Sequence, residues 1–237
     1  MNILETSEFR NKIALVTGAD GGLGRHVTQA LLGAGARVVG ASRKIGQSDF
    51  DSAEFTAVTA ELSTGAGAKI LVDDVLSRFE KVDIVVHTVG GFAGGLSVAE
   101  TDDATFQRMM DVNLNSTFHL LRAVLPAMRQ SGGGCIVAIG SRAAVDPGPG
   151  VGAYSASKAA MVSLMRTVAL ENKEFGITAN VILPGTMDTP PNRAAMPNAD
   201  FSKWVQPTTV ASLIIWLAGN AGRDVNGAVI PVYGSDV

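Results

Sequence analysis

The sequence predicts an α/β fold, with a doubly wound parallel sheet of about seven strands and helices on both of its faces. Short runs of β-branched residues alternate with longer helical stretches along the whole chain. The strand segments are apolar at nearly every position, as expected for strands that are covered on both faces. Apolar residues make up 46% of the 237 residues, which is enough for the core of one sizeable domain.

The strands are predicted at Lys12–Thr17, Arg37–Ala41, Glu54–Thr59, Val82–His87, Cys135–Ile139, Ile177–Leu183 and Ala228–Val232. The helices are predicted from a glycine turn to about Leu32, and over about Gly67–Phe79, Asp103–Arg129, Ala153–Lys173 and Thr208–Gly219. No repeat or Pro- and Ser-rich linker divides the chain, so residues 1–237 are expected to form one domain. Residues 186–206 contain the one long irregular stretch, which is either a substrate loop or a polar crossover.

Composition excludes several classes of protein. A formal charge of -3 argues against a dedicated nucleic-acid surface, which needs a basic face. Cys135 is the only cysteine and lies in an apolar run, so we expect neither an internal disulfide nor a metal site. The charged N-terminus lacks the apolar stretch of a secretory signal, and no run of about 18 apolar residues occurs. A cytoplasmic protein with no membrane partner is therefore expected.

A glycine-rich turn follows the first predicted strand and opens the first helix, as a dinucleotide site of the Rossmann type requires. Gly18 permits a sharp turn, Gly22 lets the backbone approach a pyrophosphate, and Gly24 lets the helix pack closely. The free N–H groups of the helix N-terminus favour anionic oxygens. The turn therefore predicts NAD(P) binding by Gly18, Asp20, Gly21, Gly22, Leu23 and Gly24, although such glycines can also be purely structural.

The end of the second strand indicates which dinucleotide binds. NAD-binding proteins place an acid there for the ribose 2′-hydroxyl, whereas this chain has Ser42-Arg43-Lys44. A carboxylate would repel a 2′-phosphate, and an arginine can bind it bidentately. NADP(H) is therefore the predicted cofactor and NAD(H) the alternative, unless Arg43 and Lys44 are ordinary solvated charges.

Tyr154 and Lys158 are the predicted proton-transfer pair. They are four residues apart at the start of a helix, so their side chains lie on one face. A free tyrosine has a pKa of about 10, and a nearby cation favours the phenolate, which predicts a lowered pKa. Such a tyrosine can exchange a proton with a carbonyl or an alcohol. Ser141 follows a predicted strand, so its hydroxyl is expected at the same sheet edge, where it can stabilise a developing oxyanion.

These motifs, in this order, resemble the short-chain dehydrogenase/reductase family over essentially the whole chain. The resemblance rests on the glycine turn, Asn113 in Asp-Val-Asn-Leu-Asn, Ser141, Tyr154 with Lys158, and the Pro184-Gly-Thr-Met-Asp-Thr189 segment. It implies a carbonyl or alcohol substrate and a homotetramer or homodimer. It also implies that Asn113 holds a water in a proton relay and that Lys158 binds the nicotinamide ribose.

The resemblance extends the list of cofactor contacts. Met187 and Thr189 would hold the carboxamide, with Pro184 beside them, and Glu61 and Leu62 would flank the adenine. After the fourth strand, relatives commonly have Asn-Asn-Ala-Gly, whereas this chain has His87-Thr-Val-Gly90. His87 and Val89 are expected to contact the cofactor through the backbone, and a packed His87 is favoured over a catalytic one.

Two other functions stay open at the level of sequence. The segment from Leu183 to Trp204 resembles dihydropteridine reductases, which reduce a quinonoid pterin, although Arg43 conflicts with their usual preference for NADH. A non-catalytic, nucleotide-sensing Rossmann protein would not need Ser141, Tyr154 and Lys158 together. Candidate substrate-wall residues are Arg142, Val145, Val151, Met187, Arg193, Met196 and Trp204, of which Trp204 is either a lid or an anchor of the loop.

Overall fold

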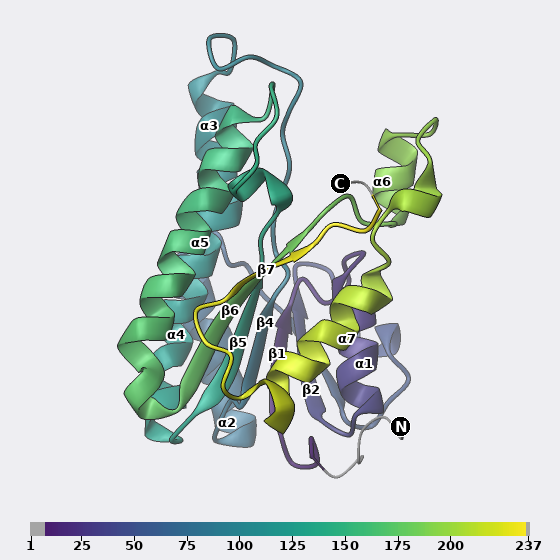
Figure 1. Ribbon diagram of the computed structural model, residues 1–237. Coiled ribbons are helices and arrows are strands. Elements are labelled where there is room, and N and C mark those ends of the chain that lie inside the picture. Colours follow the sequence, from purple (N-terminus) through teal and green to yellow (C-terminus); the bar gives the residue numbers. More distant parts are fainter. Residues whose placement is uncertain (1–7, 236–237) are drawn as a thin grey trace.

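Seven parallel strands form one sheet in the computed structural model, which describes residues 8–235 (Figure 1). The strands are β1 (Ile13–Thr17), β2 (Arg37–Ser42), β3 (Phe55–Thr59), β4 (Ile84–His87), β5 (Gly134–Ile139), β6 (Ile177–Pro184) and β7 (Val229–Val232). Their order in the sheet is β3-β2-β1-β4-β5-β6-β7. The predicted fold class is confirmed, and each strand lies within two residues of its predicted bounds.

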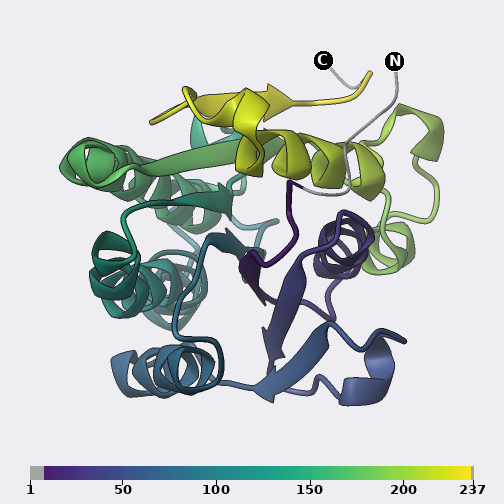
Figure 2. The same cartoon turned by 90° about the horizontal axis from the view of Figure 1, so that it is seen from below.

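Helices cover both faces of the sheet (Figure 2). One face packs against α1 (Gly24–Gly33) and α7 (Pro207–Ala218), and the other packs against α2 (Gly65–Phe79), α4 (Ser116–Gln130) and α5 (Gly152–Asn172). Alternate residues of β1 point to opposite faces, so Ala14 and Val16 join the first core while Ile13 and Leu15 join the second. Both faces of the strand are therefore buried, which explains its continuous apolar sequence.

The predicted helix over Asp103–Arg129 is wrong in one respect, because it is interrupted. It consists of α3 (Asp103–Met110), a wider π-helical turn over Asp111–Asn115, and α4. After this turn, the hydroxyls of Ser116 and Thr117 donate to the carbonyls of Val112 and Asn113, at 2.7 and 2.8 Å. Such turns are local and depend on tertiary contacts, so the apolar period does not reveal them.

The stretch predicted to be irregular contains a short helix. Its helix, α6 (Pro190–Ala195), begins with two prolines, whose fixed φ suits the first helical turn. A parallel bridge between Met187 and Val205 joins the two ends of the stretch. Residues 186–206 are thus a closed excursion above the sheet rather than a simple crossover (Figure 1).

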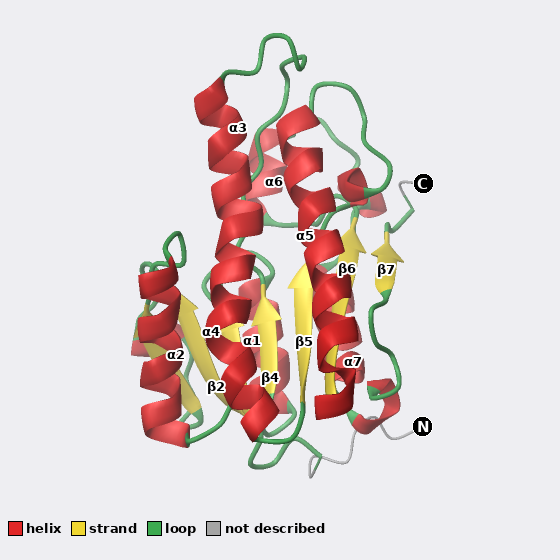
Figure 3. Ribbon diagram, turned by 90° about the vertical axis from the view of Figure 1, so that its left-hand side faces the viewer, coloured by secondary structure: helices red, strands yellow, loops and turns green. Residues whose placement is uncertain are grey.

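All seven strands end at the same edge of the sheet, because all are parallel. The helices α3 and α5 extend beyond this edge, and loops that follow the strands lie at the same edge (Figure 3). Open α/β sheets bind ligands at such carboxyl edges, where the strand order reverses. Within residues 8–235, no helix has both the length and the apolar character needed to cross a bilayer.

His87, at the end of β4, is a packed residue of the interior. Its Nδ1 lies 2.7 Å from the Thr17 hydroxyl and its Nε2 lies 3.3 Å from the Ser116 hydroxyl. Burial, and then the charge of nearby Lys158, lower the pKa of His87 to about 3. The neutral ring satisfies both of its nitrogens inside the protein, so its side chain does not reach out to a ligand.

This burial predicts a specific acid sensitivity. The unfolded chain protonates His87 below about pH 6.5, whereas the folded protein resists protonation until about pH 3. Stability is therefore lost as the pH falls through this window, by about 2 kcal/mol between pH 7 and pH 5. We expect His87→Asn to lack this part of the decrease in the free energy of unfolding, when urea unfolding is measured at pH 7 and at pH 5. His26→Asn, at a half-exposed position of α1, is the control, and an equal loss in all three proteins would contradict the assignment.

Candidate active site

A cavity of about 1030 Å³ opens at the carboxyl edge of the sheet. Its walls are the glycine turn after β1, the loops after β2, β3 and β4, and one side of α3. It lies where β1 has β2 on one side and β4 on the other, which is the switch point of the strand order. Of the predicted cofactor residues, the cavity is lined by Gly18, Asp20, Gly21, Ser42, Arg43, Glu61, Leu62 and Val89.

The glycine turn has the shape that a dinucleotide requires. Gly18 has φ of 73°, a conformation that other residues rarely adopt, and its N–H donates to the Ala41 carbonyl at 2.7 Å. A Cβ on Gly24 would collide with the Gly18 carbonyl oxygen, so only glycine lets α1 begin this close to the turn. The N-cap residue of α1 makes no side-chain hydrogen bond to the first turn, so no capping side chain competes with a phosphate for this helix N-terminus. Leu23 has its side chain in the core, so only its backbone can serve a ligand.

The loop after β2 presents two cations to the same cavity. Arg43 and Lys44 are exposed, and within residues 8–235 neither is in an ion pair. The Ser42 hydroxyl accepts hydrogen bonds from the N–H groups of Lys44 and Ile45, at 3.2 and 3.1 Å, which fixes the turn that carries both cations. Two cations without an ion-pair partner among the described residues, close to a helix N-terminus, fit a cofactor with several phosphate groups.

Ser141, Tyr154 and Lys158 converge beside the end of β5. Tyr154 lies in the first turn of α5 and forms a hydrogen bond with the Ser141 side chain. Lys158 follows one turn later, is buried, and donates from Nζ to the Ile139 carbonyl at 2.8 Å. The helix and the strand end thus bring together the three residues that the sequence proposed for proton transfer.

The pKa values in this cluster differ from the sequence-based expectation. Burial raises the pKa of Tyr154, although the Ser141 hydrogen bond opposes this effect, so the expected lowering by Lys158 is not found. The Lys158 ammonium is directed to the Ile139 carbonyl instead of to the phenol oxygen. Burial also lowers the pKa of Lys158 to about 8, close to the pH at which it could exchange a proton.

Asn113 lies inside the π-helical turn and holds the loop after β4. Its Oδ1 accepts from the Gly91 N–H and its Nδ2 donates to the Gly91 carbonyl, both at 3.0 Å. The Nδ2 group also donates to the Ser157 hydroxyl at 3.0 Å, and this hydroxyl donates to the Tyr154 carbonyl at 2.7 Å. Asn113 is therefore a buried clamp between this loop and α5, which explains why the helix widens at this point.

Two residues of this region are not predicted from the sequence. Ser157 joins Asn113 to the backbone of Tyr154, and its only signal was its place between Tyr154 and Lys158. Phe92 is mostly exposed, yet its ring packs edge-on against Tyr154, with 5.0 Å between the centroids. An isolated phenylalanine in a glycine-rich loop carries no periodic signal, so sequence reasoning could not select it.

The segment after β6 lies beside the glycine turn rather than along the cavity wall. A Cβ on Gly22 would lie 2.8 Å from Cγ2 of Thr189, so these two predicted residues are neighbours. Pro184 ends β6, and Met187 forms the bridge to Val205. Their proposed contacts with the carboxamide stay predictions.

Several candidate substrate-wall residues have other partners. Arg193 forms an ion pair with Asp188, with 2.8 Å between Nη2 and Oδ2, and lies over the Phe201 ring. This pairing lowers the pKa of Asp188 to about 2. Trp204 is buried and packs against Phe201, which makes it an anchor of the loop rather than a lid. Arg142 is likewise paired, with Asp146 at 3.0 Å.

Comparison with known proteins supports one family. Residues 12–200 match the family model described as short chain dehydrogenase. The chain is 30% identical to the 3-oxoacyl-(acyl-carrier-protein) reductase FabG of Salmonella typhimurium, over 95% of this chain and 97% of that protein. It is 29% identical to a 7alpha-hydroxysteroid dehydrogenase of Escherichia coli, over 95% of this chain and 94% of that protein.

Comparison with solved structures supports the same family. A blue fluorescent protein from a metagenomic library, in complex with NADPH, superposes with a TM-score of 0.84 at 28% identity and covers 97% of this chain and 99% of its own. A short-chain type dehydrogenase/reductase from Mycobacterium ulcerans superposes with a TM-score of 0.88 at 26% identity, over 96% and 90% of the two chains. With its fold, its cavity and its tyrosine–lysine cluster, the chain belongs to the short-chain dehydrogenase/reductase family of oxidoreductases.

Proposed function

We propose that the protein transfers a hydride between NADP(H) and the carbonyl or alcohol group of a small molecule. The observation that carries this proposal is the convergence of Ser141, Tyr154 and Lys158 at the sheet edge that holds the large cavity. The NADPH complex of a structural neighbour supports the choice of cofactor. We further propose that the protein is cytoplasmic and that it forms a homotetramer or a homodimer.

Nicotinamide supplies the hydride when it is bound, and the chain supplies binding, orientation and proton transfer. In the reducing direction, the Tyr154 hydroxyl donates its proton to the carbonyl oxygen while the Ser141 hydroxyl donates a hydrogen bond to the same oxygen. Burial keeps Tyr154 protonated, as a donor must be, and Lys158 with a pKa of about 8 is suited to return a proton. Asn113 keeps the loop after β4 in place through its two bonds to Gly91.

Residues 186–206 are the proposed substrate loop. The bridge between Met187 and Val205 and the anchoring of Trp204 support a loop with a fixed base and an exposed outer part. Met196, in that outer part, is 41% exposed, and Val145, in the loop after β5, is 56% exposed. An apolar substrate surface would find partners in both side chains.

Tyr154→Phe tests the proposed acid directly. Because the ring is kept and only the proton donor is lost, we expect kcat to fall by about 10² to 10⁴-fold. The Kd for NADPH, measured by fluorescence titration, should stay unchanged. Tyr233 is the one other tyrosine of the chain, so Tyr233→Phe is the matched control. Near-normal turnover by Tyr154→Phe would show that another group donates the proton.

Arg43→Ala tests the cofactor preference. We expect the unaltered protein to bind NADPH more tightly than NADH. In the variant, the ratio of the Kd for NADH to the Kd for NADPH should fall about tenfold, because a charge-assisted contact to the 2′-phosphate is removed. Titration of both cofactors measures the ratio. Arg37→Ala is the control, because Arg37 lies at the opposite end of β2 and pairs with Glu54. An unaltered protein that prefers NADH would refute the assignment.

A further inference from the structure

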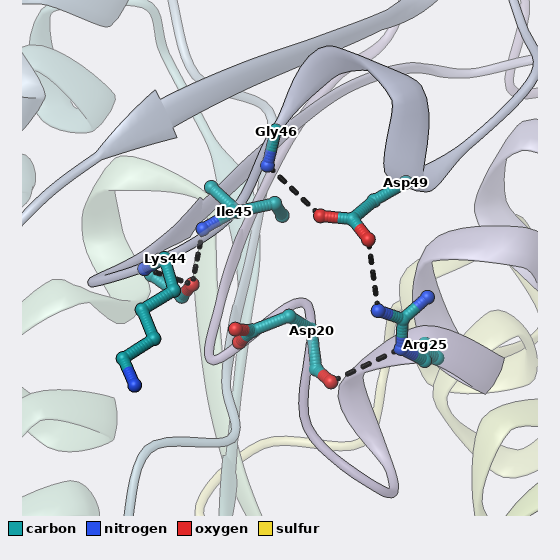
Figure 4. Close-up of polar contacts among 7 residues, drawn as sticks. Asp20, Arg25, Lys44, Ile45, Gly46 and Asp49 are labelled. Atoms are coloured by element: carbon teal, nitrogen blue, oxygen red, sulfur yellow. Dashed lines mark hydrogen bonds and ion pairs between the residues drawn. The ribbon is translucent and has the colours of Figure 1, made fainter.

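Arg25 connects the glycine turn to the loop after β2 (Figure 4). Its Nε donates to the Asp20 carbonyl at 3.1 Å, and its Nη2 donates to Oδ1 of Asp49 at 2.9 Å. The guanidinium group also lies 5.8 Å from the centre of the Phe50 ring. Two separate nitrogens of one side chain thus join the glycine turn to the far end of the loop after β2.

Asp49 fixes the far end of that loop. Its Oδ2 accepts from the Gly46 N–H at 2.8 Å, while its Oδ1 faces Arg25. These contacts, the backbone bond first, lower the pKa of Asp49, so the side chain is a carboxylate at neutral pH. Figure 4 shows that the Lys44 ammonium points away from the ion pair. Asp49 therefore stabilises the shape of the loop, while Arg43 and Lys44 line the cavity.

The same loop is also attached to the edge strand of the sheet. The Gln47 side chain donates to the Phe55 carbonyl at 2.7 Å and accepts from the Ala57 N–H at 3.1 Å. Ile45 and Phe50 are buried beneath it. The backbone is held at these points, and the ion pair between Asp49 and Arg25 adds a direct link from the loop to the glycine turn.

We propose that Arg25 and Asp49 form a latch that positions Arg43 and Lys44 for the 2′-phosphate of the cofactor. The inference rests on the proposed function, because it takes the NADP(H) preference as its premise. Among the described residues, the cavity lining includes Arg43, Lys44 and Asp20 but neither Arg25 nor Asp49. Arg25 and Asp49 are thus positioning residues, which set the spacing between the pyrophosphate turn and the cationic loop without touching the ligand.

The sign of the effect separates this latch from simple electrostatics. Removing the negative charge of Asp49 leaves the cavity more positive, so a purely electrostatic role predicts tighter binding of a 2′-phosphate. The latch predicts weaker binding, because the loop loses its fixed place. Arg25→Lys keeps the charge unchanged, but a single ammonium group cannot reproduce the two fixed contacts of the guanidinium.

The experiment compares two ligands that differ only in the 2′-phosphate: adenosine 2′,5′-bisphosphate and adenosine 5′-monophosphate. Calorimetric titration gives the Kd of each for the unaltered protein, Asp49→Asn and Arg25→Lys. We expect both variants to bind the bisphosphate about fivefold more weakly, the size of effect that a partly exposed ion pair allows. The Kd of the monophosphate should stay within about twofold of its original value.

Asp73→Asn is the matched control, because Asp73 pairs with Lys69 on the exposed face of α2, at 2.6 Å. It should change neither Kd. Unchanged or tighter binding of the bisphosphate by Asp49→Asn, or an equal loss for both ligands, would overturn the latch. If the unaltered protein binds both ligands equally, the NADP(H) preference fails and the latch fails with it. A preference that is present and survives in both variants refutes the latch alone.

Discussion

The burial of one ammonium group is the constraint on which the candidate site depends. Lys158 is buried in α5, and its described hydrogen bond goes to the Ile139 carbonyl at the end of β5. Burying a cation costs free energy unless it is bonded, and part of the cost is expressed as a pKa of about 8. A purely structural position would be served better by an apolar residue. A buried lysine that lowers the stability of the fold and has a shifted pKa therefore indicates a functional position.

The neighbours of Lys158 are adapted to its presence. His87 lies close enough for the lysine charge to disfavour its protonation, and its two hydroxyl partners satisfy the neutral ring. Asn113 lies on the other side, where a Cβ on Gly90 would come within 3.0 Å of its Oδ1 and 3.1 Å of the lysine Nζ. Glycine at position 90 thus leaves room for both groups. Among residues 8–235, Lys158 is in no ion pair, and the neutral side chains of His87 and Asn113 lie near it.

The sequence predicts those features that follow from local patterns. Strands buried on both faces give continuous apolar runs, so the seven strands and their parallel arrangement follow from segments such as residues 12–17 and 177–183. The glycine turn is recognisable because Gly18 and Gly24 meet steric demands that other residues cannot meet. Tyr154, Lys158 and Ser141 are predictable as a group because helix spacing and strand ends bring them to one edge.

What the sequence does not predict depends on contacts between distant segments. The π-helical turn around Asn113 exists because this side chain bonds to Gly91 and Ser157, far away in the chain. Arg193 contacts Phe201, eight residues further along the chain, and this contact becomes apparent only when the segment after α6 folds back. The pKa of Tyr154 is raised because burial opposes the phenolate and the lysine points elsewhere. The spacing of two residues along a helix predicts that they lie on the same face, but it does not predict toward which group a charged side chain points.

The most direct test of this account is the titration of Lys158 itself. In the unliganded protein with ¹³C-labelled lysines, NMR should show one Cε resonance that titrates at about pH 8 and is absent from Lys158→Met. The other lysines serve as internal references. Titration of the Lys158 resonance at about pH 10.4, as for a free lysine, would contradict the claim that this buried ammonium is the ionisable centre of the site.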